Sequence, residues 1–188
     1  MKKLSRRSAL LTGGAVLVAV AAGTAGTVSA NASAPAVPAA APAAASAAKG
    51  GGATMSTTHL TLASATKAAQ AALDAAKKEN QKVSVAVVDR NGNTVLTLRG
   101  DGAGPQAYEA AEKKAFTAVS WNAPTSELAK RLDKAPTLKD IPGTLFLGGG
   151  APVASQGAPI AGIGVAGAPS GDLDEKFAQA GVDSLHLR

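Results

Sequence analysis

The 188-residue chain contains no cysteine, and this absence excludes several kinds of site. Without thiols the protein has no disulfide, no zinc finger, no thiolate-held iron–sulfur cluster and no covalently attached c-type haem. Histidine is almost as scarce, because His59 and His186 are the only two. Neither lies beside a candidate nucleophile, and the chain has no G-x-S-x-G segment. A hydrolase triad is therefore not supported.

Excess basic charge is confined largely to the N-terminal end. The chain has 19 Lys and Arg against 13 Asp and Glu, a formal net charge of +6. Four of the basic residues and none of the acids lie in residues 1–30, so the rest of the chain has a net charge of only +2. This balance argues against a strongly basic nucleic-acid-binding domain, and we expect no nucleic-acid partner.

Residues 1–30 have the features of a signal peptide. A basic head leads into the apolar run 9–22, which is shorter than the roughly 20 residues of a spanning helix, so we expect no direct membrane insertion. Val28-Ser29-Ala30 provides small residues for cleavage before Asn31. Residues 5–10, with paired Arg6 and Arg7, resemble a twin-arginine signal, and an ordinary Sec signal is the alternative. We expect a secreted protein, extracellular or associated with the cell wall.

Low-complexity sequence follows, and then a single domain. Residues 31–57 consist mainly of Ala, Pro, Ser and Gly, which is typical of a disordered spacer. Residues 58–188 carry the globular pattern and are long enough for one hydrophobic core. We therefore predict a signal peptide at 1–30, a spacer at 31–57 and one domain at 58–188.

Hydrophobic periodicity predicts an α+β fold with a mostly antiparallel sheet. Thr61 and Ser170 are suitable N-caps for the first and last helices, and Asn91-Gly92 favours a tight type I′ hairpin. A Thr125 cap introduces the short third helix. We expect helices at 62–80, 106–121, 126–132 and 172–184, and strands at 83–88, 94–99, 144–147, 152–155 and 160–165.

Two patterns resemble binding motifs, but each has an ordinary structural interpretation. Residues 162–167 read G-x-G-x-x-G, yet these glycines lie within a predicted strand rather than between a strand and a helix. A strand that lets another backbone approach closely is therefore favoured over a nucleotide site. Asp101, Glu109 and Glu112 could hold a hard cation, although acids at this spacing are more often a solvated helix start.

The predicted helix 106–121 has two stripes and contains three of the five Phe, Tyr and Trp residues. The first stripe, suited to packing on the sheet, consists of Tyr108, Ala111, Ala115 and Val119. The second consists of Ala110, Lys114, Thr117 and Trp121. This second face suits another subunit or a flat amphiphilic ligand such as a porphyrin, whose propionates a lysine can pair. The pattern alone favours the subunit interface.

Several segments, taken in order, resemble the GlcG/HbpS haem-degrading-domain family, especially its secreted actinomycete members. They span most of residues 58–185 and read VAVVDRNGN, RGDGA, EKKAFTA, GTLFLGGG and IAGIGVAG followed by SGD. The resemblance implies a profilin-like, three-layer α/β/α fold with a five-stranded antiparallel sheet. It also implies a homo-octamer, binding of haem and iron, slow haem breakdown and redox signalling to a membrane sensor histidine kinase.

Within the matched helix the resemblance places Thr117 toward the haem iron. We expect Lys114 to face a propionate and Trp121 to contact the porphyrin, while His59 stays as a rival or second iron ligand because imidazole is a commoner one. The family's surface iron-binding acids have no counterpart in the first helix, which carries Lys77 and Lys78.

Two classes of function remain open from the sequence. One is a binding and sensing protein that couples haem outside the cell to a kinase. The other is an enzyme that degrades haem with peroxide or acts on a small metabolite. The sequence shows no convincing acid–base pair, which favours the binding protein.

Overall fold

A computed structural model describes residues 53–187, and the predictions made for residues 1–52 lie outside this range. The described residues belong to one compact unit. Its elements in chain order are α1 (Leu62–Lys78), β1 (Ser84–Asp89), β2 (Thr94–Arg99), α2 (Pro105–Trp121), α3 (Thr125–Ala129), η1 (Lys130–Asp133), η2 (Pro136–Asp140), β3 (Gly150–Ser155), β4 (Ala158–Ala166) and α4 (Gly171–Asp183). The predicted α+β class is confirmed.

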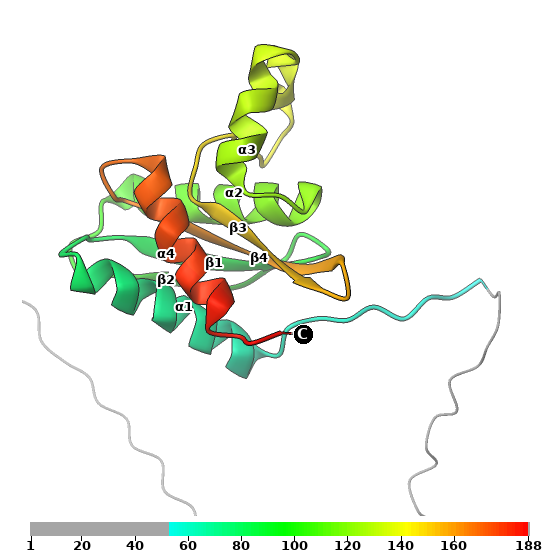
Figure 1. Cartoon of the computed structure of the whole chain (residues 1–188), viewed down its shortest axis with the longest axis horizontal. Helices are drawn as coiled ribbons and strands as arrows, with labels where there is room; N and C mark the ends of the chain where they lie inside the picture. The colour runs from blue at the N-terminus through cyan, green and yellow to red at the C-terminus, as the bar shows by residue number, and fades with distance from the viewer. Residues whose placement is uncertain (1–52, 188) are drawn as a thin grey trace, which may run out of the picture. The chain divides into compact units, whose positions relative to one another are not determined.

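The strands form one antiparallel sheet in the order β2-β1-β4-β3 (Figure 1). β4 is the longest strand and lies between β1 and β3, so that Ile163 faces Val87 on one side and Ala151 on the other. β2 and β3 are the two edges. Pro152 lies on the edge strand β3, where a missing N–H is tolerated.

Helices cover both faces of the sheet, which is the middle of three layers (Figure 1). On one face α1 and α4 pack over the main core, to which β1 contributes Val85 and Val87. On the other face α2 covers Ala86 and Val88. Successive strand residues point to opposite faces, so the continuous apolar run of β1 contributes side chains to both cores.

Thr61 and Ser170 cap their helices as predicted. The Thr61 hydroxyl accepts a hydrogen bond from the Ser64 amide at the start of α1, and the Ser170 hydroxyl accepts one from the Leu173 amide at the start of α4. Thr125 does not cap α3, because Pro124 occupies the N-cap position. The caps of α1 and α4 depend on neighbours in sequence, whereas the Thr125 hydroxyl of α3 accepts a hydrogen bond from the distant Gly150 amide.

The type I′ turn predicted at Asn91-Gly92 is wrong, and a turn of this geometry occurs at the other hairpin. At the β1–β2 turn Gly92 has φ +87°, but Asn91 does not adopt a positive φ, so the turn is not type I′. Instead the Asp89 carboxylate accepts hydrogen bonds from the amides of Asn91 and Asn93 and holds a wider turn. At the β3–β4 hairpin, Gln156 and Gly157 both have positive φ, as a type I′ turn requires.

The prediction of a fifth strand at residues 144–147 is wrong. Within residues 53–187 the sheet has four strands, and this segment is irregular. The Leu145 amide donates to the hydroxyl of Thr117 on α2 instead of to a neighbouring strand. Phe146 is buried against Trp121. Side-chain contacts with α2 therefore replace the pairing that the composition suggested.

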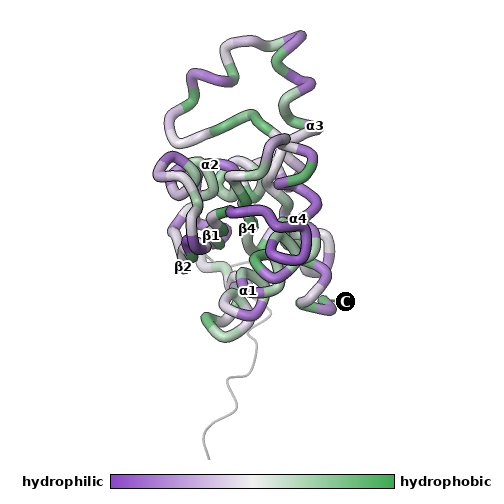
Figure 2. The backbone as a smooth tube through the Cα atoms, turned by 90° about the vertical axis from the view of Figure 1, so that its left-hand side faces the viewer, coloured by the Kyte–Doolittle hydropathy of each residue, from purple (hydrophilic) through white to green (hydrophobic). Residues whose placement is uncertain are grey.

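Residues 125–140 form an arm that projects from the α2 side, away from the sheet (Figure 1). Figure 2 shows hydrophilic and hydrophobic residues alternating along it. A small separate core fixes its base, formed by Ala123, Leu128 and Phe146 with Trp121, Leu132 and Leu138 packed against it.

The glycine-rich β4 allows α2 to approach the sheet at backbone distance. A Cβ at Gly164 would lie 2.0 Å from the Ala111 carbonyl oxygen, and one at Gly162 would lie 2.2 Å from that of Ala115. The prediction that G-x-G-x-x-G marks a strand open to close approach is confirmed, and the approaching backbone is α2.

Candidate functional site

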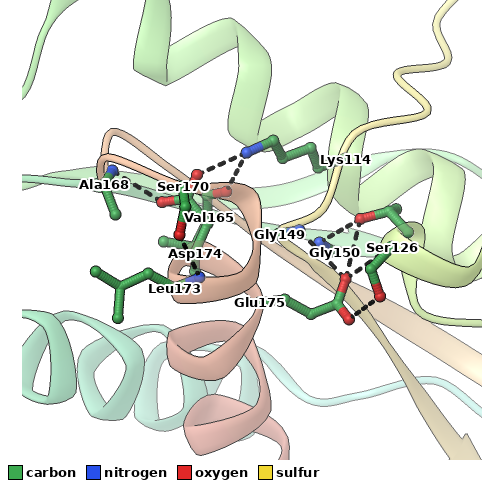
Figure 3. Close-up of polar contacts among 11 residues, drawn as sticks. Lys114, Ser126, Gly149, Gly150, Val165, Ala168, Ser170, Leu173, Asp174 and Glu175 are labelled. Atoms are coloured by element: carbon green, nitrogen blue, oxygen red, sulfur yellow. Dashed lines mark hydrogen bonds and ion pairs between the residues drawn. The ribbon is translucent and has the colours of Figure 1, made fainter. Parts of the chain in front are cut away.

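Lys114 lies where α2 meets β4 and α4, and it is only 2% exposed. Its ammonium donates hydrogen bonds to Oδ2 of Asp174 at 2.7 Å and to the Val165 carbonyl oxygen at 3.1 Å (Figure 3). The prediction that the second stripe of α2 forms a free face is therefore wrong at this residue. Burial counts against Lys114 as the partner of a haem propionate, and that role stays a prediction.

Asp174, in the first turn of α4, completes the buried pair. Burial raises the pKa of the Asp174 carboxyl, against the opposing effect of the Lys114 ammonium. The other carboxylate oxygen accepts a hydrogen bond from the Ala168 amide at 2.9 Å. The pair thus joins α2, the end of β4 and α4, and we interpret it as a structural fastening.

Thr117 is fully buried and lies on the same stripe. Its hydroxyl donates to the Lys113 carbonyl oxygen at 2.7 Å and accepts from the Leu145 amide at 2.8 Å. The hydroxyl thereby anchors the loop after the arm to α2. Within a single chain this arrangement counts against a direct contact of Thr117 with haem iron, which also stays a prediction.

The remaining stripe residues are less buried. Trp121 is half-buried, and its ring meets that of Phe146 edge-on with centroids 5.2 Å apart. Ala110 packs against the core under α2. On the first stripe Ala111, Ala115 and Val119 are buried as predicted, but Tyr108 is 43% exposed.

His59 lies in the segment before α1 and keeps an accessible imidazole, with 34% of its side chain exposed. Nε2 lies 2.8 Å from the Thr57 hydroxyl, and Nδ1 lies 4.0 Å from Oδ2 of Asp89. Of the four residues predicted to contact haem, His59 alone combines accessibility with a common iron-ligand group.

Asp89 supports this region from the hairpin turn. Partial burial opposes its ionisation, but hydrogen bonds from Asn93 and Asn91, with the nearby His59, hold the pKa of Asp89 below its ordinary value. The carboxylate therefore stays ionised down to lower pH than an ordinary aspartate. Its Oδ2 lies 4.0 Å from the imidazole Nδ1, beyond hydrogen-bond distance.

A second polar network beside the Lys114 pair was not predicted from the sequence. The Thr125 hydroxyl accepts from the Gly150 amide at 2.7 Å, and the Glu175 carboxylate accepts from the Ser126 amide at 2.9 Å (Figure 3). The network fixes the base of the arm to α4. Its members are far apart along the chain, with Ser126 and Glu175 separated by 49 positions, so the sequence does not predict it.

Two of the three acids proposed for a hard cation have other partners. Glu109 pairs with Lys113 at 2.6 Å, and Glu112 accepts a hydrogen bond from the Thr97 hydroxyl at 2.8 Å. In the part of the chain that the structure describes, no three His, Cys, Asp or Glu side chains gather as metal ligands.

Two hollows of the described surface stand out, and neither is lined by His59 or Thr117. The larger, about 480 Å³, lies beside the C-terminal half of α1, and the smaller, about 260 Å³, lies between Pro124 and α4. Neither of these two hollows could cover a porphyrin bound at His59.

None of the helices in residues 53–187 is both long and apolar enough to cross a membrane.

Comparison with known proteins identifies the relatives. A crystal structure of Streptomyces reticuli HbpS, a double mutant with two glutamates three residues apart changed to aspartate, is 72% identical; the match covers 76% of this chain and 97% of that one, with a TM-score of 0.70. The crystal structure of a PduOC–haem complex is 26% identical over 70% of this chain and 98% of that one, with a TM-score of 0.64.

A protein from the dhaT–dhaS intergenic region of Citrobacter freundii is 33% identical over 129 residues, 66% of this chain and 90% of its own length. The model of the family described as "Haem degrading protein HbpS-like" matches residues 60–183. The chain therefore belongs to the HbpS-like family of haem degrading proteins.

Proposed function

We propose that the domain binds haem and holds it through the imidazole of His59. The observation that carries the proposal is the haem complex of a relative whose chain is matched over 98% of its length, together with the family's description. His59 adds an accessible nitrogen next to the ionised Asp89. Asp89 lies on the Nδ1 side of the ring, and Nε2 lies 2.8 Å from the Thr57 hydroxyl, a neutral partner that an iron ion would displace.

The haem site is completed by a second copy of the chain. Most haem affinity comes from burying the porphyrin plane, and His59 lines neither of the two hollows described above. Tyr108, Ile141 and Leu147 are large apolar side chains that remain exposed in one copy. We propose a closed homo-oligomer, an octamer, in which such surfaces are covered.

Replacing His59 by alanine should weaken haem binding at least about tenfold and shift the Soret band, because the ligand nitrogen is lost. Thr117→Ala should keep the Soret position but lower the free energy of unfolding by about 1–3 kcal/mol, because the buried Leu145 amide loses its acceptor. His186→Ala is the matched control, since this histidine is exposed and is not among the residues predicted to contact haem. An unchanged spectrum in His59→Ala with a lost one in Thr117→Ala would reverse the assignment.

We further propose that the protein acts outside the cell as an accessory of a membrane sensor histidine kinase. Support comes from the signal-like residues 1–30 and from the family resemblance.

Replacing Arg6 and Arg7 by lysines keeps the charge but removes the twin-arginine pair, so we expect precursor to accumulate in the cytoplasm. Normal secretion of this variant would contradict the twin-arginine route. Neighbouring genes for a kinase and its response regulator would support the partner, and a catabolic operon would oppose it.

Haem breakdown is a second candidate, which the family's description favours. Lys114 and Asp174, a close ionisable pair, are buried and pair with each other, which disfavours an acid–base role. We expect the Soret band of the haem-loaded protein to survive peroxide as long as that of a haem–albumin control. Faster loss would favour the enzyme.

A further inference from the structure

A charged groove of about 480 Å³ is lined by none of the residues discussed for haem. The C-terminal half of α1 forms one wall, and the start of β1 with the loop after β2 forms the other. Leu73 and Val83 supply its apolar part, and the other lining side chains are amides and charged groups. The volume falls within the range of small-molecule sites, roughly 300–1,000 Å³.

Three cationic side chains line this groove without a carboxylate partner. They are Lys77 on α1, Lys82 before β1 and Arg99 at the end of β2. Within residues 53–187 the ion pairs involve other groups, so none of the three has an acidic oxygen within 4.0 Å. Unpaired cations in a concave surface attract an anionic group.

Arg99 is held in place by the chain itself. Its Nε and Nη2 donate hydrogen bonds to the Ala103 carbonyl oxygen at 3.1 and 2.7 Å. A guanidinium has five N–H groups, so this anchor leaves others for a ligand. Because the side chain is already ordered, binding costs less conformational entropy than it would with a mobile arginine.

The loop that anchors Arg99 also positions Lys82. A Cβ at Gly102, where φ is +77°, would lie 2.9 Å from Cδ of Lys82 and 3.3 Å from its Nζ. A Cβ at Gly100 would lie 2.7 Å from the Val83 carbonyl oxygen. The two glycines thus let the loop pack closely on β1, with the Lys82 ammonium across it.

Two carboxylates in the same groove restrict the ligand further. Asp74 accepts a hydrogen bond from the Gln70 amide at 2.9 Å, and Asp101 lies in the loop between the two glycines. They repel a compact anion such as inorganic phosphate but accept hydrogen bonds from hydroxyl or amino groups.

We propose that this groove binds a small organic carboxylate that also carries hydrogen-bond donors. Its carboxylate lies between Arg99 and Lys82, and its donor groups face Asp74 and Asp101. The site is separate from haem binding and does not depend on it.

Isothermal titration of the full haem-free protein with glycerate, which has one carboxylate and two hydroxyl groups, tests the proposal at constant ionic strength. We expect saturable binding of glycerate, and none of glyceramide, which keeps both hydroxyls but lacks the charge. Arg99→Gln and Lys82→Gln should each weaken glycerate binding at least about tenfold, since each removes a charge-assisted hydrogen bond. Two variants are needed because Arg99→Gln also removes the Ala103 contact.

Lys130→Gln is the matched control, because this exposed lysine lies on the arm and its loss changes the net charge equally. It should bind glycerate like the wild type. Failure to saturate, equal binding of inorganic phosphate or glyceramide, or an equal loss in Lys130→Gln would overturn the proposal.

Discussion

Replacing Lys114 by methionine should lower the free energy of unfolding at pH 7 by about 3–5 kcal/mol. The substitution keeps much of the side-chain volume but leaves the buried Asp174 carboxylate without its cation. It also removes the donor to the Val165 carbonyl oxygen. Chemical denaturation of the variant and the wild type gives the difference directly.

The loss should shrink as the pH falls. Burial already raises the pKa of Asp174, so its folded state binds a proton more tightly than its unfolded state. A raised pKa in the folded state means that stability is retained at low pH and falls as the pH rises through that pKa. Without Lys114 this effect should grow, and the variant should recover part of its stability in mild acid.

The double variant Lys114→Met, Asp174→Leu is the control. It removes both charges, so it should be more stable than Lys114→Met alone, although the Ala168 amide then lacks its acceptor. Equal stability of the wild type and Lys114→Met would show that the pair does not fasten α2 to α4.

Gly164→Ala should be the most damaging single methyl addition, with a loss of about 3 kcal/mol or more. Its Cβ would lie 2.0 Å from the Ala111 carbonyl oxygen and 2.5 Å from the Ala115 amide nitrogen. Both atoms are backbone, so the clash is relieved only if all of α2 moves away from β4. Thermal unfolding with a coincident helix signal measures the cost.

Gly157→Ala separates this clash from backbone strain. Gly157 has φ +80° at the β3–β4 turn, and a Cβ there meets nothing within 4 Å. The expected loss is the left-handed penalty alone, about 1–2 kcal/mol. A larger loss at Gly157 than at Gly164 would contradict the close approach of α2.

Local sequence patterns predict most of the helices and strands, and contacts between residues far apart along the chain account for the differences. The helix at α1 and the strand at β1 follow from periodicity and from the Thr61 cap, which depend on neighbours in sequence. The glycines of β4 predict the close approach of another backbone, because they lie within an apolar strand rather than between a strand and a helix. Residues 144–147 have a strand-like composition, but hydrogen bonding to Thr117, 28 residues away along the chain, overrides it.

The candidate site was harder to predict than the fold. Helical spacing places Lys114 and Thr117 on one face, but it does not tell whether that face is covered. Lys114 meets Asp174 60 residues later, and the arm returns over Thr117. His59 is predicted as a candidate ligand from residue type alone, because it is one of only two histidines in the sequence.

Titrating the haem-free protein with haem, followed at the Soret band, tests the central claim most directly. Specific binding predicts a shifted band that saturates at a fixed ratio of haem to chains, in a particle that light scattering shows to be larger than one chain. Continued spectral change without saturation would mean nonspecific association and would contradict haem binding as the function.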